Sequence, residues 1–257
     1  ETYGEDPTLA AALGTAYTNG VQEGETAGRK AESVAKHFLG FHNSQGGIHG
    51  ANCDIPERLL NEVYGKPFQA SISEANLRGI MPCYSSINGE PLSSSHKMLT
   101  GLLREEMGFD GVCAADYGAV GNVFHVQKVG ESVTEAGLMC MEAGMDVEMQ
   151  NCVGFNEELK EWFRSGRANM EILDRAVRRI LEAKFRMGIF EHPYALENEA
   201  LQEAFYRKED EGILLRAALE SLILLKNNGV LPFNPNGRKI AVVGCHAQNA
   251  RCFFGGY

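Results

Sequence analysis

One short segment constrains the fold of this chain more than any other feature of its sequence. A helix-like stretch from Leu102 ends at Gly108, a short apolar run follows, and that run stops at Asp116, beside Tyr117. An α/β barrel builds its reactive face from the C-terminal ends of its strands, so a buried strand that ends on a carboxylate suits such a barrel. An Asp after a strand is also a common helix cap or turn residue, and this segment alone leaves both interpretations open.

Strand and helix patterns alternate along the first three quarters of the chain. Short apolar runs predict strands at residues 32–38, 79–85, 111–115 and 145–149, and helical spacing predicts helices at 8–23, 56–75, 95–107, 134–143, 156–164 and 170–187. Residues 40–55 are rich in Gly and polar side chains, which predicts a long loop. Strands that alternate with helices of roughly 10–15 residues are typical of βαβ units on a parallel sheet.

The pattern changes near residue 190. Residues 191–212 are polar with weak periodicity, and we interpret them as a linker. A helix at 210–220 and strands at 221–226 and 239–244 then predict the start of a second α/β layer over residues 213–257. The chain begins with Glu1 rather than Met, and both of its ends lie in motif-like sequence. We therefore expect a fragment of a longer protein.

Composition excludes several classes of partner. With 257 residues, 44% of them hydrophobic, the chain is large enough to bury a substantial core. A formal net charge of −10 disfavours nucleic acid, an anionic membrane surface and an acidic polysaccharide, and it favours a small neutral ligand. No apolar run approaches the roughly 18 residues of a membrane span. We expect neither a nucleic-acid nor a membrane partner, and the sequence leaves a homo-oligomer open.

The cysteines and histidines indicate neither a disulfide framework nor a metal site. None of the seven Cys stands in a CxxC pair, and Cys83, Cys113 and Cys140 lie in apolar runs. Buried reduced thiols, and with them a reducing compartment such as the cytoplasm, are the favoured interpretation. His42 and His49 lie on a Gly-rich loop with a spacing that matches no ligand pattern. We expect no metal and no cofactor.

Several motifs occur in the order typical of one enzyme family. They are Ala35-Lys36-His37-Phe38, then Met81-Pro82-Cys83-Tyr84-Ser85-Ser86-Ile87-Asn88-Gly89, the segment that ends at Asp116, Ala143-Gly144-Met145-Asp146-Val147-Glu148-Met149, and Leu224-Leu225-Lys226-Asn227. Each motif is weak alone, but the ordered set resembles glycoside hydrolase family 3. The resemblance implies the second half of a (β/α)8 TIM-type barrel over residues 1–190, followed by the beginning of an α/β sandwich domain.

The resemblance also implies an activity and a set of site residues. It implies a retaining exo-acting β-glycosidase that releases terminal glucose or xylose, with Asp116 as the nucleophile. A retaining glycosidase needs one carboxylate as nucleophile and a second carboxyl as acid/base. The resemblance places the acid/base glutamate on the second domain, beyond Tyr257, so the fragment alone is expected to be inactive. By the same resemblance, substrate is bound by Lys36, His37, Met81, Tyr84 and Tyr117.

The sequence departs from the family pattern in three places. Tyr117 stands where relatives often have Trp, and it keeps an aromatic edge for the sugar. Cys113, Ala114 and Ala115 replace branched aliphatic residues and a hydroxyl residue before Asp116, although the positions stay small or apolar. The loop after Lys36 and His37 lacks the Asp–His pair of the hexosaminidase branch, which favours the glucosidase and xylosidase branch. A β-N-acetylhexosaminidase and a non-catalytic carbohydrate-binding relative remain the alternatives. The sequence does not determine which sugar or linkage is recognised.

Overall fold

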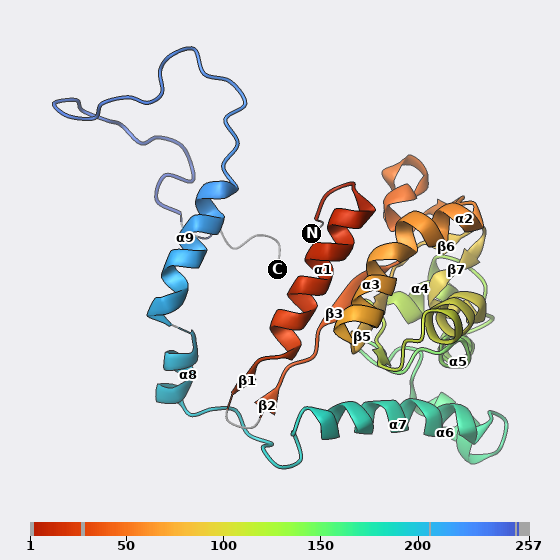
Figure 1. Ribbon diagram of the computed structural model, residues 1–257. Helices are drawn as coiled ribbons and strands as arrows, with labels where there is room; N and C mark the ends of the chain where they lie inside the picture. The colour runs from red at the N-terminus through yellow and green to blue at the C-terminus, as the bar shows by residue number, and fades with distance from the viewer. Residues whose placement is uncertain (1–2, 27–28, 206, 250, 252–257) are drawn as a thin grey trace. The chain divides into compact units, whose positions relative to one another are not determined.

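The centre of the first part of the chain is a sheet of parallel strands (Figure 1). The computed structural model describes residues 3–26, 29–205, 207–249 and 251, and the chain divides into two units, residues 1–195 and 196–257. Strands β3 (Val34–Phe38), β5 (Gly79–Pro82) and β8 (Val112–Cys113) lie in the order β3-β5-β8, all parallel. A parallel bridge between Ala114 and Val147 adds a further segment at the β8 edge.

Three of the predicted strands are confirmed with shorter bounds, and the prediction at 145–149 is reduced to that single bridge. The backbone N–H groups of Asp146 and Val147 both donate to the Cys113 carbonyl, at 2.8 and 3.3 Å. Two donors converging on one acceptor do not repeat as a regular ladder, so the segment is irregular although it lies beside β8. An α/β architecture with a parallel sheet is nevertheless as expected.

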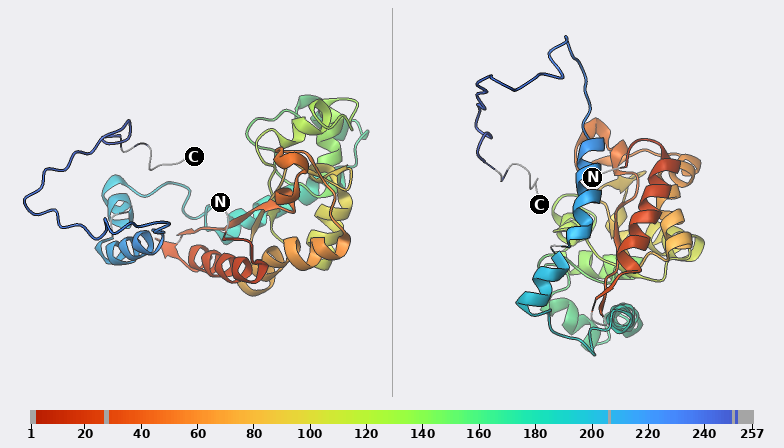
Figure 2. Two further views of the ribbon diagram at one scale, coloured as in Figure 1. Left: turned by 90° about the horizontal axis from the view of Figure 1, so that it is seen from above. Right: turned by 60° about the vertical axis from the view of Figure 1, so that its left-hand side comes forward.

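Helices flank the sheet and match most of the predicted ranges. They are α1 (Pro7–Gln22), α2 (Glu57–Leu59), η3 (Leu60–Gly65), α3 (Lys66–Ala75), η5 (Lys97–Glu106), α4 (Ala119–His125), α5 (Val133–Ala143), α6 (Glu157–Arg164) and α7 (Met170–Arg186). Asp6 caps α1: its carboxylate accepts the backbone N–H groups of Thr8 and Leu9 at 2.7 and 3.3 Å. Helices α1 and α3 pack side by side (Figures 1 and 2).

A second, smaller sheet forms in the loops that follow β3 and β5. The predicted loop at 40–55 contains the turns η1 (Phe41–Asn43) and η2 (Gln45–Gly47) and the strand β4 (Asn52–Cys53). Strand β4 pairs with β6 (Ser86–Ile87), which turns back into β7 (Glu90–Pro91). Asn88 and Gly89 have φ of 51° and 88°, so this pair makes the tight turn that its sequence predicts. A short hairpin, β1 (Glu25–Thr26) with β2 (Arg29–Lys30), precedes β3.

The end of β8 is buried in two apolar clusters. Cys113 is fully buried with Phe38, Ile80, Leu99 and Leu103, and Ala115 is fully buried with Ala119, Val120, Val123, Ala136 and Met145. Side chains this small let helix α4 and the neighbouring strand approach closely. The substitutions before Asp116 are therefore accommodated by close packing.

Thiol reactivity gives a direct check of this core. Cys53, Cys83, Cys113 and Cys140 are buried and free, as expected for reduced thiols, whereas Cys152 is exposed. Burial raises the pKa of the Cys83 and Cys113 thiols to about 12, and it also raises the pKa of Cys140. Only the thiolate reacts with iodoacetamide. In the folded full-length protein at about pH 8, close to the ordinary thiol pKa, we expect Cys152 to be alkylated rapidly and Cys113 to be protected.

Mass spectrometry of the labelled peptides reads this result site by site. Labelling in denaturant is the control, in which the buried thiols should react like Cys152. Alkylation of Cys113 in the folded protein at the rate of Cys152 would contradict the buried position of β8.

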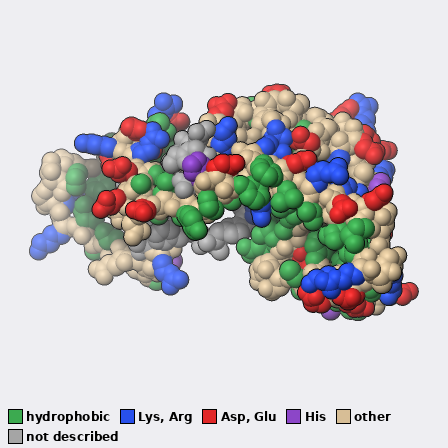
Figure 3. Space-filling view, turned by 90° about the horizontal axis from the view of Figure 1, so that it is seen from below, with side chains coloured by type: hydrophobic (Ala, Val, Ile, Leu, Met, Phe, Trp, Pro, Cys, Tyr) green, Lys and Arg blue, Asp and Glu red, His purple; other side chains and the backbone are tan. Residues whose placement is uncertain are grey.

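Helix α7 has the predicted length but only part of its apolar stripe is covered. Ala176 and Ala183 are buried, whereas Val177, Leu181 and Phe185 are 41–62% exposed. Hydrophobic side chains also gather in one area of the face seen in Figure 3. In the described part of the chain, no helix is both long and apolar enough to cross a bilayer.

The second unit differs most from the sequence-based expectation. It contains α8 (Asn198–Phe205), η6 (Lys208–Asp210) and α9 (Glu211–Glu220), so the helix at 210–220 is confirmed and the expected linker includes a helix. The strands predicted at 221–226 and 239–244 are wrong for this structure, because neither range forms a strand. A strand requires a partner for its backbone groups. Leu225 and Val243 are instead 91% and 83% exposed.

Candidate active site

The residues singled out in the sequence come from the ends of three adjacent strands. Lys36 and His37 lie in β3, Met81 lies in β5, and Tyr84 follows β5 by two residues. Asp116 lies in the segment after β8, which we call the Asp116 loop (residues 114–118). Because parallel strands end at the same edge of a sheet, these side chains are delivered to one region.

The structure brings His37 and Asp116 together although 78 residues separate them in the chain. The His37 Nε2 atom lies 3.2 Å from Asp116 Oδ2, and the two side chains are 12% and 15% exposed. The other oxygen, Asp116 Oδ1, accepts the backbone N–H of Tyr117 at 2.7 Å. One carboxylate oxygen is thus held by its own loop, and the other lies against an imidazole.

Asp116 is not the cap of the following helix. Helix α4 begins after Gly118, whose φ is 70°, and its N-terminus has no side-chain cap. The contact that Asp116 makes with α4 is through its backbone carbonyl, which accepts the N–H of Ala119 at 3.0 Å. The helix-cap interpretation of this residue is therefore wrong, whereas the turn interpretation fits, because this contact between Asp116 and Ala119 closes a four-residue turn.

The Asp116 loop is fastened from two sides. The Tyr84 hydroxyl donates to the Tyr117 carbonyl at 2.7 Å, and the Gly118 N–H donates to the Met149 carbonyl at 3.0 Å. The Tyr117 side chain itself is 56% exposed. The loops after β5 and after Val147 therefore both position the backbone around Asp116.

Lys36 and Met81 are register partners on neighbouring strands. Side chains at paired positions of a parallel ladder leave the sheet on the same face. Lys36 is exposed and Met81 is half-buried.

An aromatic residue that the sequence analysis did not single out supports His37. The Phe41 ring meets the His37 ring edge-on, with centroids 5.3 Å apart, and it stacks against His42 at 3.9 Å. Burial lowers the pKa of His42. Phe41 begins the turn that lies three residues after the end of the strand with His37, and this position is the signal that would have identified Phe41.

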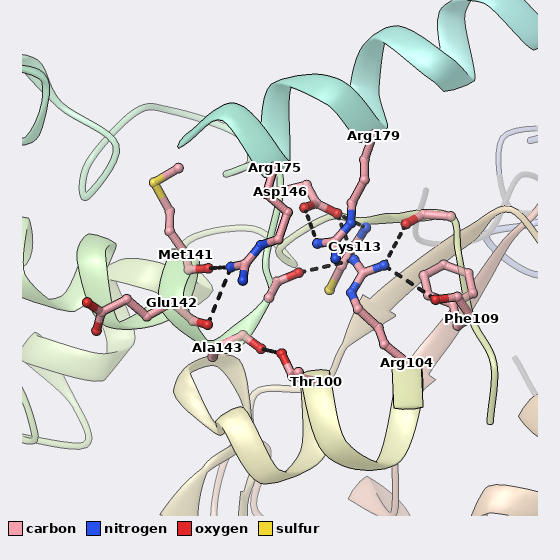
Figure 4. A network of polar contacts seen from close by, with 12 residues as sticks. Thr100, Arg104, Phe109, Cys113, Met141, Glu142, Ala143, Asp146, Arg175 and Arg179 are labelled. Carbon is pink, nitrogen blue, oxygen red and sulfur yellow. Dashed lines mark hydrogen bonds and ion pairs between the residues drawn. The ribbon is translucent and has the colours of Figure 1, made fainter. Parts of the chain in front are cut away.

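Asp146 holds β8 through a buried ionic network (Figure 4). Its Oδ2 atom accepts from Arg104 at 2.8 Å and from the Cys113 N–H at 2.9 Å, and its Oδ1 atom accepts from Arg179 at 2.9 Å. The Asp146 side chain is 1% exposed. This carboxylate joins η5, α7 and β8, and its role is structural.

The Glu148 carboxylate is also held by hydrogen bonds from the backbone. Its carboxylate accepts the N–H groups of Gly154, at 3.0 and 3.1 Å, and of Phe155, at 2.7 Å. Among the residues that the structure describes, no group of three or more His, Cys, Asp or Glu side chains is placed to hold a metal.

Comparison with known proteins relates this geometry to one family. Residues 1–183 match the model of the glycosyl hydrolase family 3 N-terminal domain. Among similar proteins are a β-xylosidase of Formosa agariphila, 34% identical over 98% of this chain and 36% of its own length, and a lysosomal β-glucosidase of Dictyostelium discoideum, 32% identical over 100% of this chain and 32% of its own.

A solved structure shows the same similarity in three dimensions. The β-glucosidase from Listeria innocua, crystallised in complex with glucose, superposes with a TM-score of 0.79 and 30% identity, covering 90% of this chain and 32% of that protein. The chain spans about a third of the length of these relatives.

Proposed function

Because this chain belongs to glycosyl hydrolase family 3, we propose that it supplies the nucleophile side of a retaining, exo-acting β-glycosidase that releases terminal glucose or xylose. One observation carries the proposal: Asp116 Oδ2 lies 3.2 Å from His37 Nε2, at the ends of adjacent parallel strands. The names of the relatives, β-xylosidase and β-glucosidase, support the substrate class.

In the first half of the reaction Asp116 acts as the nucleophile. A carboxylate oxygen bonds to the anomeric carbon while the glycosidic C–O bond breaks, and the leaving oxygen takes a proton from an acid. Water then displaces Asp116 from the same carbon, with the acid group now acting as a base. The result is a sugar with its original anomeric configuration.

The neighbouring side chains hold the sugar and the nucleophile. Lys36 and His37 donate hydrogen bonds to sugar hydroxyls, and donors of this kind stabilise an oxocarbenium-like transition state when those contacts tighten there. Met81, Tyr84 and Tyr117 pack against the ring of the sugar. Tyr84 also orients the Asp116 loop, since its hydroxyl donates to the Tyr117 carbonyl.

The acid/base carboxyl is not assigned to any residue of this chain. We place it on a second domain, whose beginning is residues 213–257, joined by a linker at 191–212 to half of a (β/α)8 barrel at 1–190. Residues 1–257 alone are therefore expected not to turn over substrate, so activity has to be measured on the full-length protein.

A covalent-labelling experiment tests the proposal. A 2-fluoro-β-glycosyl fluoride of glucose or xylose forms the glycosyl-enzyme but slows its hydrolysis, so the adduct accumulates. Mass spectrometry should find the fluorosugar on the peptide that contains Asp116. Binding of the sugar without any adduct would identify a non-catalytic carbohydrate-binding protein instead. An adduct on another carboxylate would show that Asp116 is not the nucleophile.

A further inference from the structure

Phe41 connects the hydrophobic core to the His37 side chain. Its own side chain is half-buried and packs against the core cluster that includes Phe38 and Ile80. Its ring meets the His37 imidazole edge-on, with centroids 5.3 Å apart and an angle of 83° between the two planes. Because the core holds Phe41 on one side, its ring offers a fixed surface to the imidazole on the other.

The backbone of the turn η1 also fixes Phe41. The Phe41 carbonyl accepts two hydrogen bonds from Ser44, one from the backbone N–H at 3.1 Å and one from the hydroxyl at 2.6 Å. Gly40, directly before the turn, has φ of 78°, and a Cβ there would lie 2.7 Å from Ile55 Cδ1. Glycine adopts this left-handed conformation without strain. The chain can therefore turn back sharply between the end of β3 and Phe41.

Ser44 joins this turn to the loop that follows β5. The Ser44 hydroxyl lies 3.1 Å from the hydroxyl of Ser85, which is fully buried. A serine hydroxyl has one proton to donate, and that of Ser44 goes to the Phe41 carbonyl, so Ser85 is the donor in this pair. Ser85 directly follows Tyr84, whose hydroxyl holds the Tyr117 carbonyl. The segments beside His37 and beside the Asp116 loop are thus fastened to each other.

We propose that Phe41 is a positioning residue for the glycosidase reaction. It holds the His37 imidazole in the orientation that brings Nε2 to 3.2 Å from Asp116 Oδ2. The inference rests on the proposed function, because Phe41 acts through a side chain that we place on the sugar. An edge-on contact brings the positive edge of one ring to the negative face of the other, so it favours one relative orientation. An aliphatic side chain fills similar space without that preference.

A double-mutant cycle with Phe41→Leu and His37→Ala tests this role. Leu retains the apolar packing against the core but removes the ring. We expect kcat/KM of the full-length protein on an activated aryl β-glycoside to fall about three- to tenfold in Phe41→Leu, the range for loss of one aromatic pair. In the His37→Ala background the same replacement should lower kcat/KM less than about twofold, because no imidazole is left to position.

Phe41→Tyr is the conservative variant. It keeps the ring and adds one hydroxyl to a side chain that is only half-buried. Its kcat/KM should stay within about twofold of that of the unmodified protein. A loss in Phe41→Tyr as large as that in Phe41→Leu would contradict a role for the aromatic edge.

Phe68→Leu is the matched control for core packing. Phe68 is also half-buried, packs against the same core cluster and meets the Phe38 ring edge-on, with centroids 5.1 Å apart. Phe68→Leu should lower the midpoint of thermal unfolding about as much as Phe41→Leu does, yet leave kcat/KM within about twofold. Equal losses of kcat/KM in the two Leu variants would show that Phe41 contributes only to packing.

The outcomes separate this inference from the proposed function. Full activity of Phe41→Leu, or a loss that is the same with and without His37, would overturn the positioning role while the glycosidase activity stands. Failure of the unmodified full-length protein to turn over the aryl β-glycoside would overturn the proposed function, and the role of Phe41 with it.

Discussion

Replacement of Asp116 by Ala should lower kcat of the full-length protein on an activated aryl β-glycoside by about 10⁴-fold or more, the scale typical of removing a covalent nucleophile. We expect this loss because Asp116 is the carboxylate that the structure places at the strand ends, with its Oδ2 atom against His37 Nε2. Without it, no covalent glycosyl-enzyme can form. Initial rates measured with a chromogenic leaving group give the value.

Azide provides a second readout for the same variant. A small anionic nucleophile fits the space left by the carboxylate, and it should restore part of the turnover. The product should be a glycosyl azide of inverted configuration, because only one displacement then takes place. NMR of the product determines that configuration, and rescue would show that the variant is folded.

Asp110→Ala is the matched control for Asp116→Ala. Asp110 lies six residues earlier, is 70% exposed and pairs with Arg78 at 2.7 Å. Exposed ion pairs of this kind contribute about 0–1 kcal/mol. Its loss should leave kcat nearly unchanged. Asp116→Ala with a kcat as high as that of Asp110→Ala would remove the basis for the proposed mechanism.

Replacement of Asp146 by Ala is expected to have the largest effect on stability. The side chain is 1% exposed and accepts from Arg104, Arg179 and the Cys113 N–H. Burial lowers the pKa of Arg104, whereas the charge of Asp146 acts in the opposite direction. Removing the carboxylate leaves two guanidinium groups close together and largely buried. We expect the free energy of unfolding to fall by about 3–5 kcal/mol, as when one partner of a buried ion pair is removed.

Urea denaturation monitored by circular dichroism measures this loss. Glu62→Ala, which removes the exposed pair with Arg58, is the control and should cost less than about 1 kcal/mol. A triple replacement of Arg104, Asp146 and Arg179 by Met, Leu and Met should recover part of the loss, because no buried charge is then left unpaired. An Asp146→Ala protein as stable as Glu62→Ala would show that the network contributes little.

Local signals in the sequence were sufficient to predict much of the secondary structure of the first unit. Asp6 before Pro7 marked the start of α1, and Asn88 with Gly89 marked the turn between β6 and β7. The apolar run before Asp116 likewise predicted β8. The first two features depend on hydrogen bonds and backbone angles within a few residues, so a short window of sequence contains the information. Strand β8 also needs its partner β5, which the structure supplies.

The same reasoning failed where a segment needs a distant partner. Residues 221–226 and 239–244 have the apolar character of buried strands, yet they are exposed and form no strand. The pattern of apolar residues indicates which side chains a segment can bury. A sheet also requires a neighbouring strand that pairs with the backbone N–H and C=O groups. Residues 191–212 show the converse, because α8 forms there despite a weak pattern.

The sequence by itself therefore determined the family resemblance, the parallel α/β layer and the residue type at each strand end. Only the tertiary structure decided that His37 meets Asp116, that Asp146 holds Arg104 and Arg179, and that Tyr84 reaches the Asp116 loop. Contacts of this second kind join residues from different elements. They depend on how those elements pack, which the spacing of residues along one chain does not specify.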